Sequence, residues 1–200
     1  MFKLISTISL ALLMFMTGQA NAALIVDTGT PTQVSLGSVL TGNDYFAGQV
    51  AFNQDSTINS IQTFLTLDTP SDFATNSFTV ALYSNTATNS VGSLINTFTA
   101  NYSGSGWNGV NNLNEQVLAG KYWIAFEGDS SGATYIAPNT PNPLALTAFA
   151  SASAYSIYPM GFALRVDAVS AVPEANNYAM LITGLGILPF MSRRRKNGQA

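Results

Sequence analysis

The 200-residue chain contains neither cysteine nor histidine, and only 8% of its residues are charged. Without these two residue types there is no thiolate nucleophile, no Ser-His-Asp triad, and no imidazole or thiolate ligand for zinc, copper or haem. A disulfide framework is also excluded. Because 47% of the residues are hydrophobic, the chain can bury enough apolar surface to fold. The composition therefore predicts a folded protein with little scope for catalysis.

The first 22 residues have the pattern of a secretory signal peptide. Lys3 precedes an apolar run from Leu4 to Met16, and the segment closes with Ala20-Asn21-Ala22. Small residues at Ala20 and Ala22 are what a signal peptidase requires. The run is shorter than the ~20 residues that cross a bilayer as a helix. We therefore expect cleavage, with a mature chain that begins near Ala23.

Near the other end, an uncharged apolar segment at 178–191 precedes a basic cluster of Arg193, Arg194, Arg195 and Lys196. The segment predicts a hydrophobic helix about 21 Å long, at about 1.5 Å per residue. This is a short span for a hydrocarbon core of about 30 Å. Because basic residues stay on the cytoplasmic side, the helix would anchor the unprocessed protein in the inner membrane with its body outside.

Directly before that helix stand Val172, Pro173, Glu174 and Ala175. Pro173 keeps this stretch extended and accessible. The order V-P-E, a short spacer, an apolar helix that begins Y-A-M-L and contains G-L-G, and a terminal R-R-R-K resembles the PEP-CTERM sorting signal of Gram-negative bacteria. The resemblance implies processing by an exosortase, a membrane peptidase, and a role in exopolysaccharide or biofilm matrix. Ala175 stands where the family's usual P-E-P motif has its second proline.

The body between these signals, residues 23–170, is acidic. It carries two basic residues, Lys121 and Arg165, against nine acidic ones, a net charge of −7. This balance excludes a nucleic-acid partner held through phosphate contacts. Its 148 residues suit a single domain with one core.

Two-residue alternation of apolar and polar side chains is the main pattern of the body. Clusters of Gly, Asn, Ser and Pro at 84–92, 103–112, 128–132 and 138–143 separate the apolar stretches. No amphipathic helix is predicted. The fold class expected is all-β, an antiparallel jelly-roll-like β-sandwich. Strands are predicted at 24–26, 32–40, 45–52, 58–67, 78–83, 93–101, 115–119, 121–127, 133–137 and 161–169.

The segment from Glu115 to Glu127, E-Q-V-L-A-G-K-Y-W-I-A-F-E, predicts a hairpin that turns at Ala119-Gly120 and places Glu115 opposite Ile124. Its L-A-G-K-Y-W-I-A-F stretch resembles a hairpin of exported β-sandwich domains that carry PEP-CTERM signals. That resemblance implies a fold and an export context rather than a reaction.

Carboxylate chemistry is the one catalytic route that the composition leaves open. Glu115 and Glu127 are the only glutamates of the body. The expected hairpin separates them by about 10 Å, at the long end of inverting glycosidase geometry. We expect two solvated strand-end acids and no enzyme.

Calcium is a second alternative. Asp68 and Asp72 flank a turn and Asp129 lies in G-D-S-S-G, but none forms a D-x-D-x-D-G loop. We expect turn-capping aspartates and no cofactor or bound metal, with a structural calcium ion as the alternative.

The two tryptophans are the candidate glycan contacts. Trp107 lies in the polar stretch S-G-S-G-W-N-G beside Asn108, Asn111 and Asn112, and Trp123 lies in the expected hairpin. Sugar sites combine flat aromatic rings with amide side chains. Large aromatic residues in small sandwiches more often pack in the core or anchor loops.

Together these features predict an exported, non-enzymatic protein of the cell surface or exopolysaccharide matrix. The partners expected are signal peptidase, an exosortase, the inner membrane transiently through 178–191, and extracellular polysaccharide. The alternatives are a carbohydrate-binding module that uses Trp107, Trp123 and Asn108, and a carboxylate hydrolase.

Overall fold

The computed structural model describes residues 23–32, 38–40, 42–66, 77–102, 104–128, 134–136, 140–151 and 154–170, and the regular structure in these ranges is all β-strand. The strands are β1 (Ala23–Asp27), β2 (Ser38–Leu40), β3 (Asp44–Phe52), β4 (Ser56–Thr66), β5 (Ser77–Asn85), β6 (Val91–Asn101), β7 (Gly106–Val110), β8 (Glu115–Val117), β9 (Gly120–Gly128), β10 (Thr134–Ile136), β11 (Thr147–Ser151), β12 (Ser156–Ile157) and β13 (Leu164–Ser170).

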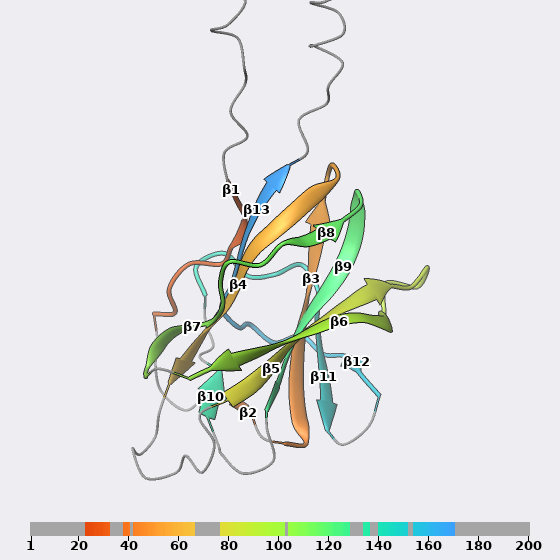
Figure 1. The fold of residues 1–200 in the computed structure, drawn as a ribbon. Helices are drawn as coiled ribbons and strands as arrows, with labels where there is room; N and C mark the ends of the chain where they lie inside the picture. The colour runs from red at the N-terminus through yellow and green to blue at the C-terminus, as the bar shows by residue number, and fades with distance from the viewer. Residues whose placement is uncertain are drawn as a thin grey trace, which may run out of the picture. The chain divides into compact units, whose positions relative to one another are not determined.

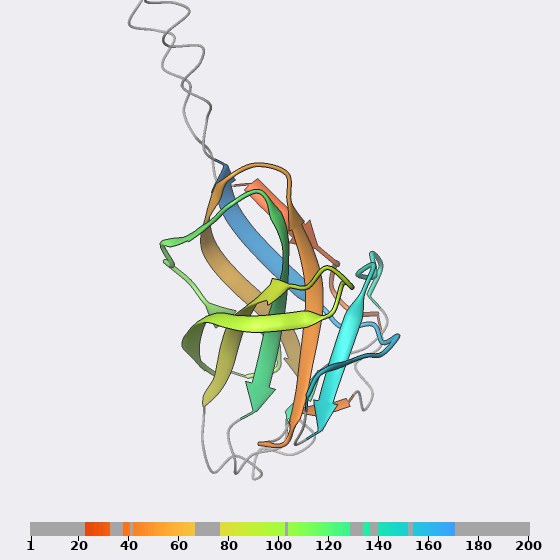
Figure 2. The same ribbon diagram turned by 90° about the vertical axis from the view of Figure 1, so that its right-hand side faces the viewer.

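The strands form two antiparallel sheets that face each other (Figures 1 and 2). Sheet A has the order β1-β13-β4-β10-β2, with β7 and β8 also paired to β4. Sheet B has the order β12-β11-β3-β9-β5-β6. The prediction of an all-β, antiparallel, sandwich-like fold is confirmed.

The strand pairs are nested along the chain. The first strand, β1, pairs with the last, β13, and β3 pairs with β9. Inside these, β4 pairs with β7 and β8, and β5 pairs with its direct successor β6. Among the described strands, only β5–β6 and the short pair β11–β12 join strands that follow each other directly in the sequence. Segments far apart in the sequence therefore meet throughout the fold.

The main core lies between the sheets and follows the predicted alternation. Phe46, Val50 and Phe52 of β3 are buried there, as are Leu164 and Val166 of β13. Their alternate neighbours on β3 and β13 turn to the outer faces of the sheets. Removing such a side chain from water stabilises the fold by about 1.5–3 kcal/mol.

A second apolar cluster covers the outer face of sheet B. Trp123 of β9 lies there among Ala47, Ala81, Ala125 and Ala148, with no exposed surface. Small side chains on the neighbouring strands leave room for the indole ring. Partly buried residues close the cluster over it, namely Tyr83, Val91, Leu146 and Tyr155. As a result, β9 is buried on both faces.

The predicted hairpin at 115–127 is wrong. β8 belongs to sheet A, where Glu115 lies opposite Ile58 of β4 rather than opposite Ile124. β9 belongs to sheet B, between β3 and β5. The chain crosses between the sheets after Val117, and the crossing is fixed by a 2.8 Å hydrogen bond from the Ala119 amide to Asp55 Oδ1. Pairing with β4 outweighs the local turn tendency.

Three strands appear where the sequence pattern gave none. β7 lies inside the predicted loop at 103–112, and β11 and β12 were not predicted. β7 approaches β4 so closely that a Cβ at Gly109 would clash with the Ile61 carbonyl oxygen. Of the strand expected at 32–40, the described residues are Thr32, which lies in a bend, and Ser38–Leu40, which form β2.

Candidate functional site

Several predicted functional residues lie outside the described ranges. These are the signal-peptidase residues Ala20 and Ala22, the sorting motif 172–175, the helix 178–191, the basic cluster 193–196, and the calcium candidates Asp68, Asp72 and Asp129. Among the described residues, no helix has the length and apolar character needed to cross a membrane. The same residues contain no group of three or more acidic side chains placed to hold a metal ion.

Trp123 is not available as a glycan contact. Its side chain is fully buried in the second apolar cluster. Its indole Nε1 donates a 2.9 Å hydrogen bond to Asn85 Oδ1, which also accepts from Gln49 Nε2 at 2.8 Å. The expectation that Trp123 contacts a glycan is corrected, because the outer face of β9 is covered rather than open.

Asn108 is also turned inward. It is only 3% exposed, and its Nδ2 donates to the carbonyl oxygens of Gly104 and Gly106, each at 2.8 Å. The side chain therefore holds the glycine-rich turn before β7. Its amide is engaged with the fold and is not presented to a ligand, which corrects the expectation that Asn108 contacts a glycan.

Trp107 of β7, in contrast, is half-buried on the outer face of sheet A. Its ring meets Phe64 of β4 edge-to-face, with centroids 5.6 Å apart. The guanidinium carbon of Arg165 lies 3.9 Å from the ring centroid, a cation–π contact. Of the predicted glycan contacts, Trp107 is thus the one that remains near solvent, although Arg165 covers part of its ring.

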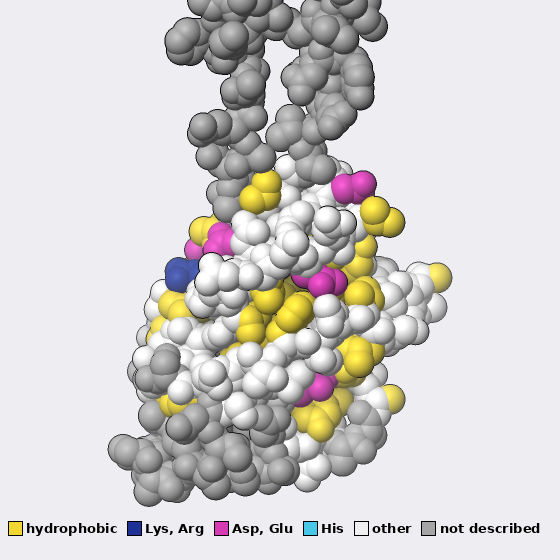
Figure 3. Space-filling view, in the orientation of Figure 1, with side chains coloured by type: hydrophobic (Ala, Val, Ile, Leu, Met, Phe, Trp, Pro, Cys, Tyr) yellow, Lys and Arg dark blue, Asp and Glu magenta, His cyan; other side chains and the backbone are white. Residues whose placement is uncertain are grey.

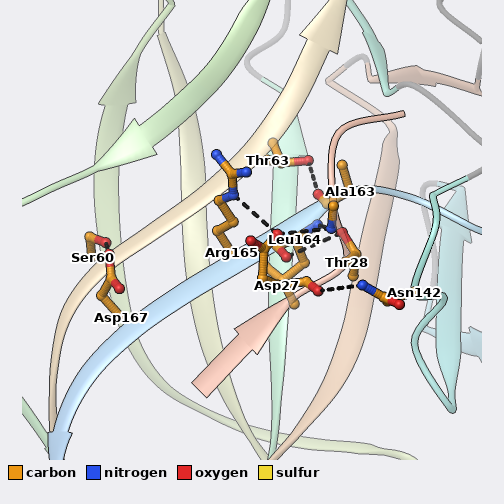
Figure 4. Close-up of polar contacts among 10 residues, drawn as sticks. Asp27, Thr28, Ser60, Thr63, Asn142, Ala163, Leu164, Arg165 and Asp167 are labelled. Atoms are coloured by element: carbon orange, nitrogen blue, oxygen red, sulfur yellow. Dashed lines mark hydrogen bonds and ion pairs between the residues drawn. The ribbon is translucent and has the colours of Figure 1, made fainter. Parts of the chain in front are cut away.

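Arg165 is held in this position by an ion pair with Asp27 of β1 (Figure 4). Its Nε donates to Asp27 Oδ1 at 3.1 Å, and the two side chains are 30% and 32% exposed. The same Oδ1 accepts from the Gly29 amide at 2.8 Å. Partial burial raises the pKa of Asp27, but the Gly29 hydrogen bond and Arg165 outweigh it, so the pKa lies below its usual value.

Other polar side chains continue across the outer face of sheet A. Ser60 donates to Asp167 Oδ2 at 2.8 Å, joining β4 to β13 (Figure 4). Gln62 donates to Asn111 Oδ1 at 3.2 Å. This face combines two aromatic rings with amide, hydroxyl and ion-paired groups. We take it as the candidate ligand surface and call it the sheet A face, defined by Asp27, Ser60, Gln62, Phe64, Trp107, Asn111, Arg165 and Asp167.

The outer face of sheet B carries a carboxylate held by two phenols. Glu127 Oε1 accepts from Tyr83 at 2.7 Å and from Tyr155 at 2.9 Å. The two tyrosine rings meet edge-to-face with centroids 5.6 Å apart. Burial raises the pKa of both phenols, and the adjacent Glu127 carboxylate raises it further. The cluster ties the segment after β11 to sheet B.

The two glutamates proposed as an alternative catalytic pair lie on different sheets. Glu115 is on β8 and accepts a 2.8 Å hydrogen bond from Asn96 of β6. Glu127 is on β9 and bonds the two tyrosines. The separation expected from a hairpin ladder no longer applies, since the hairpin does not form.

Sequence analysis did not identify Asp27, Phe64 or Arg165 as neighbours of Trp107. The alternation of Arg165 with Leu164 and Val166 indicated that Arg165 faces outward. No local signal connected it to Asp27, which is 138 positions away. Comparison with protein-family models and with curated protein sequences gives no match for this chain.

Proposed function

We propose that this chain is an exported, non-enzymatic β-sandwich protein of the cell surface or exopolysaccharide matrix, sorted by an exosortase-type system. One observation carries the proposal. All strands of the described residues, from β1 at Ala23 to β13 at Ser170, lie between the proposed signal-peptidase residues and the motif at 172–175. Cleavage at both places would remove no residue of these strands.

The environment of the acidic groups supports a non-enzymatic role. Asp27 pairs with Arg165, Asp167 accepts from Ser60, and Asp55 accepts from the Ala119 amide. Both glutamates likewise bond residues of neighbouring strands. Catalytic carboxylates instead need a second acid or base that shares their substrate. The proposed role requires no cofactor.

The nested strand pairs support the jelly-roll form of the sandwich. A jelly roll is a long antiparallel ribbon wrapped into two sheets, so its outermost strands pair with each other and its innermost strands form a hairpin. The pairs β1–β13, β3–β9, β4–β8 and β5–β6 follow this order. β11 and β12 extend sheet B beside β3.

Intact mass and cell fractionation in a bacterium with an exosortase test the proposal. The wild type is compared with a variant in which Arg193, Arg194 and Arg195 are replaced by Ala. We expect a wild-type species that runs from about Ala23 to the motif at 172–175, found outside the inner membrane and lost in the variant. An intact C-terminus that stays in the inner membrane in both proteins would reject sorting.

Carbohydrate binding at the sheet A face is the second candidate. It is favoured by Trp107, which is half-buried beside the hydrogen-bonding side chains of Gln62, Asn111 and Arg165. Neutral sugars bind through such combinations of rings and polar groups. Because Trp123 is fully buried, acrylamide quenching of fluorescence reports mainly on Trp107.

The test uses a panel of neutral polysaccharides and the Trp123→Phe variant, in which Trp107 is the one remaining tryptophan. A neutral polysaccharide that binds this face should reduce the acrylamide quenching of Trp107 fluorescence. The Trp107→Phe variant is the matched control and should show no protection. Equal quenching with and without every polysaccharide in the Trp123→Phe variant would reject a glycan site at this face.

A further inference from the structure

One sheet edge differs from the others. β6 is the end strand of sheet B and has 11 residues. Within the described residues, the other strands at a sheet end, or on the side of β4 away from β13, are short: β12 has two residues, β2 and β8 have three, and β1 and β7 have five. Short edges offer few unpaired backbone groups, whereas a long one is a template for another strand.

β6 also lacks the features that protect sheet edges. No charged residue and no proline occurs from Asn85 to Asn114, a range that contains all of β6 and β7. Leu94 and Ile95 of β6 are 53% and 46% exposed. Charges and prolines are the usual means by which edge strands avoid pairing with other chains. The nearest acid is Glu115, which is bonded to Asn96.

Figure 3 shows apolar side chains gathered on this side of the molecule, in the region between β6 and β8, with acidic side chains around them. Here the two sheets present their edges next to each other, and Leu113 and Phe98 are partly buried against the main core. An edge that offers both backbone groups and apolar surface is suited to another strand.

The part of β6 suited to pairing is Asn96–Asn101. Its ladder with β5 is regular from Asn96 to Asn101, and the irregularities lie before Asn96. Thr97 and Thr99 are exposed, while Phe98 packs against the main core. Six residues extend for about 20 Å and provide about six hydrogen bonds to an antiparallel partner.

We propose that β6 of one copy pairs antiparallel with β6 of a second copy, which joins two B sheets across a twofold axis. The occupant is a second copy for two reasons. The body carries a net charge of −7, so copies repel each other, and an uncharged edge is where the repulsion is weakest. An antiparallel pair of identical strands is also self-complementary, with threonines meeting across the axis.

This inference goes beyond the proposed function and does not depend on how the protein is sorted. Self-association would let copies link into larger assemblies, if they are delivered to a matrix. A failure of sorting leaves the edge unchanged, and a failure of self-association leaves export unchanged. The two proposals therefore fail in different experiments.

Single cysteines in the full chain test the pairing, because the natural chain has none. Chains that carry Thr97→Cys or Thr99→Cys are oxidised with copper–phenanthroline, each chain by itself and the two chains mixed together. The oxidation is done in every cell fraction. Ser156→Cys, on the exposed β12 at the opposite end of sheet B, is the matched control. Directly paired residues are close enough for a disulfide. We expect at least fivefold more disulfide dimer from the β6 cysteines than from Ser156→Cys.

A charge placed on the edge should then abolish the dimer. Thr97→Lys is added to the Thr99→Cys chain, and Thr57→Lys, on β4 of the other sheet, is the matched control. We expect the first lysine to lower the disulfide yield at least fivefold and the second to leave it unchanged. The emission of buried Trp123 shows that each variant is folded. Equal yields at β6 and Ser156, or no effect of Thr97→Lys, would overturn the proposal.

Discussion

Replacing Glu127 with Gln should destabilise the sandwich. Glu127 Oε1 accepts two short hydrogen bonds, from Tyr83 and Tyr155. Bonds to a charged acceptor contribute about 1.5–3 kcal/mol and bonds between neutral groups about 1 kcal/mol. The carboxylate is half-buried, so we take the lower end of this difference for each bond. At about 0.5 kcal/mol for each of the two bonds, the free energy of unfolding should fall by about 1 kcal/mol.

The same substitution should change the titration of the two phenols. Burial raises the pKa of Tyr83 and Tyr155, and the charge of Glu127 raises it further. With Gln in place, burial still raises the pKa of each phenol and the neighbouring tyrosines still shift it, but the contribution of Glu127 is lost, so both pKa values should fall. In the wild type, unfolded tyrosines ionise near pH 10 while these two stay protonated in the fold. Stability should therefore decrease as the pH rises above about 10, and less steeply in the variant.

Urea unfolding followed by tryptophan emission measures the free energy. Tyrosinate absorbance measures the titration. A double-mutant cycle of Glu127→Gln with Tyr155→Phe should give a coupling of about 1 kcal/mol, since the two groups share a hydrogen bond. A variant within about 0.3 kcal/mol of the wild type, with an unchanged tyrosine titration, would refute the reasoning.

Four further substitutions follow from the ion pair at Asp27 and from the packing. Asp27→Asn should cost about 0.5 kcal/mol at neutral pH. Because the pKa of Asp27 is lowered below 3.8, the difference from wild type should shrink in acid as Asp27 protonates, and a gap in urea unfolding that does not narrow as the pH falls below 3.8 would contradict this. Gly109→Ala places a Cβ against the Ile61 carbonyl oxygen and should lower the free energy of unfolding by about 1–3 kcal/mol, measured by thermal unfolding. No loss would mean that β7 separates from β4 freely. Phe162→Ala, at a fully buried site, should cost about 3–5 kcal/mol in the same assay, whereas Leu118→Ala, 70% exposed, should change less than about 0.5 kcal/mol.

Local alternation was sufficient to predict most strands, because one face of each sheet is buried against the other sheet. The residues of β3 and β5 show this most clearly, with Phe46, Val50, Phe78 and Val80 all in the main core. Alternation did not reveal β7, whose sequence G-W-N-G-V has the polar and glycine content of a loop. β7 forms because β4 has an edge available for pairing, and the sequence of β7 itself gives no sign of that edge.

Trp123 shows a second limit. It lies on the same face of β9 as Lys121 and Glu127, and the sequence left open whether that face is exposed to a ligand or covered by another segment. The segment around Leu146 and Tyr155, distant in sequence, covers that face. Periodicity reports which residues share a side of a strand, but it does not report what later segment packs on that side. The neighbours of Trp107 on the sheet A face were not predicted for the same reason, because they come from strands that are distant in the sequence.

The nested pairing has a consequence for the time course of folding. β13 lies between β1 and β4 in sheet A, so the sheet has a gap at this position until the last strand arrives. Contacts between ends so far apart close slowly, because the loop entropy is lost before the pairing compensates for it. The body therefore cannot complete its fold before Ser170 is free to pair with Ser56. If the protein is exported as proposed, sheet A closes only after the whole body has left the translocation channel.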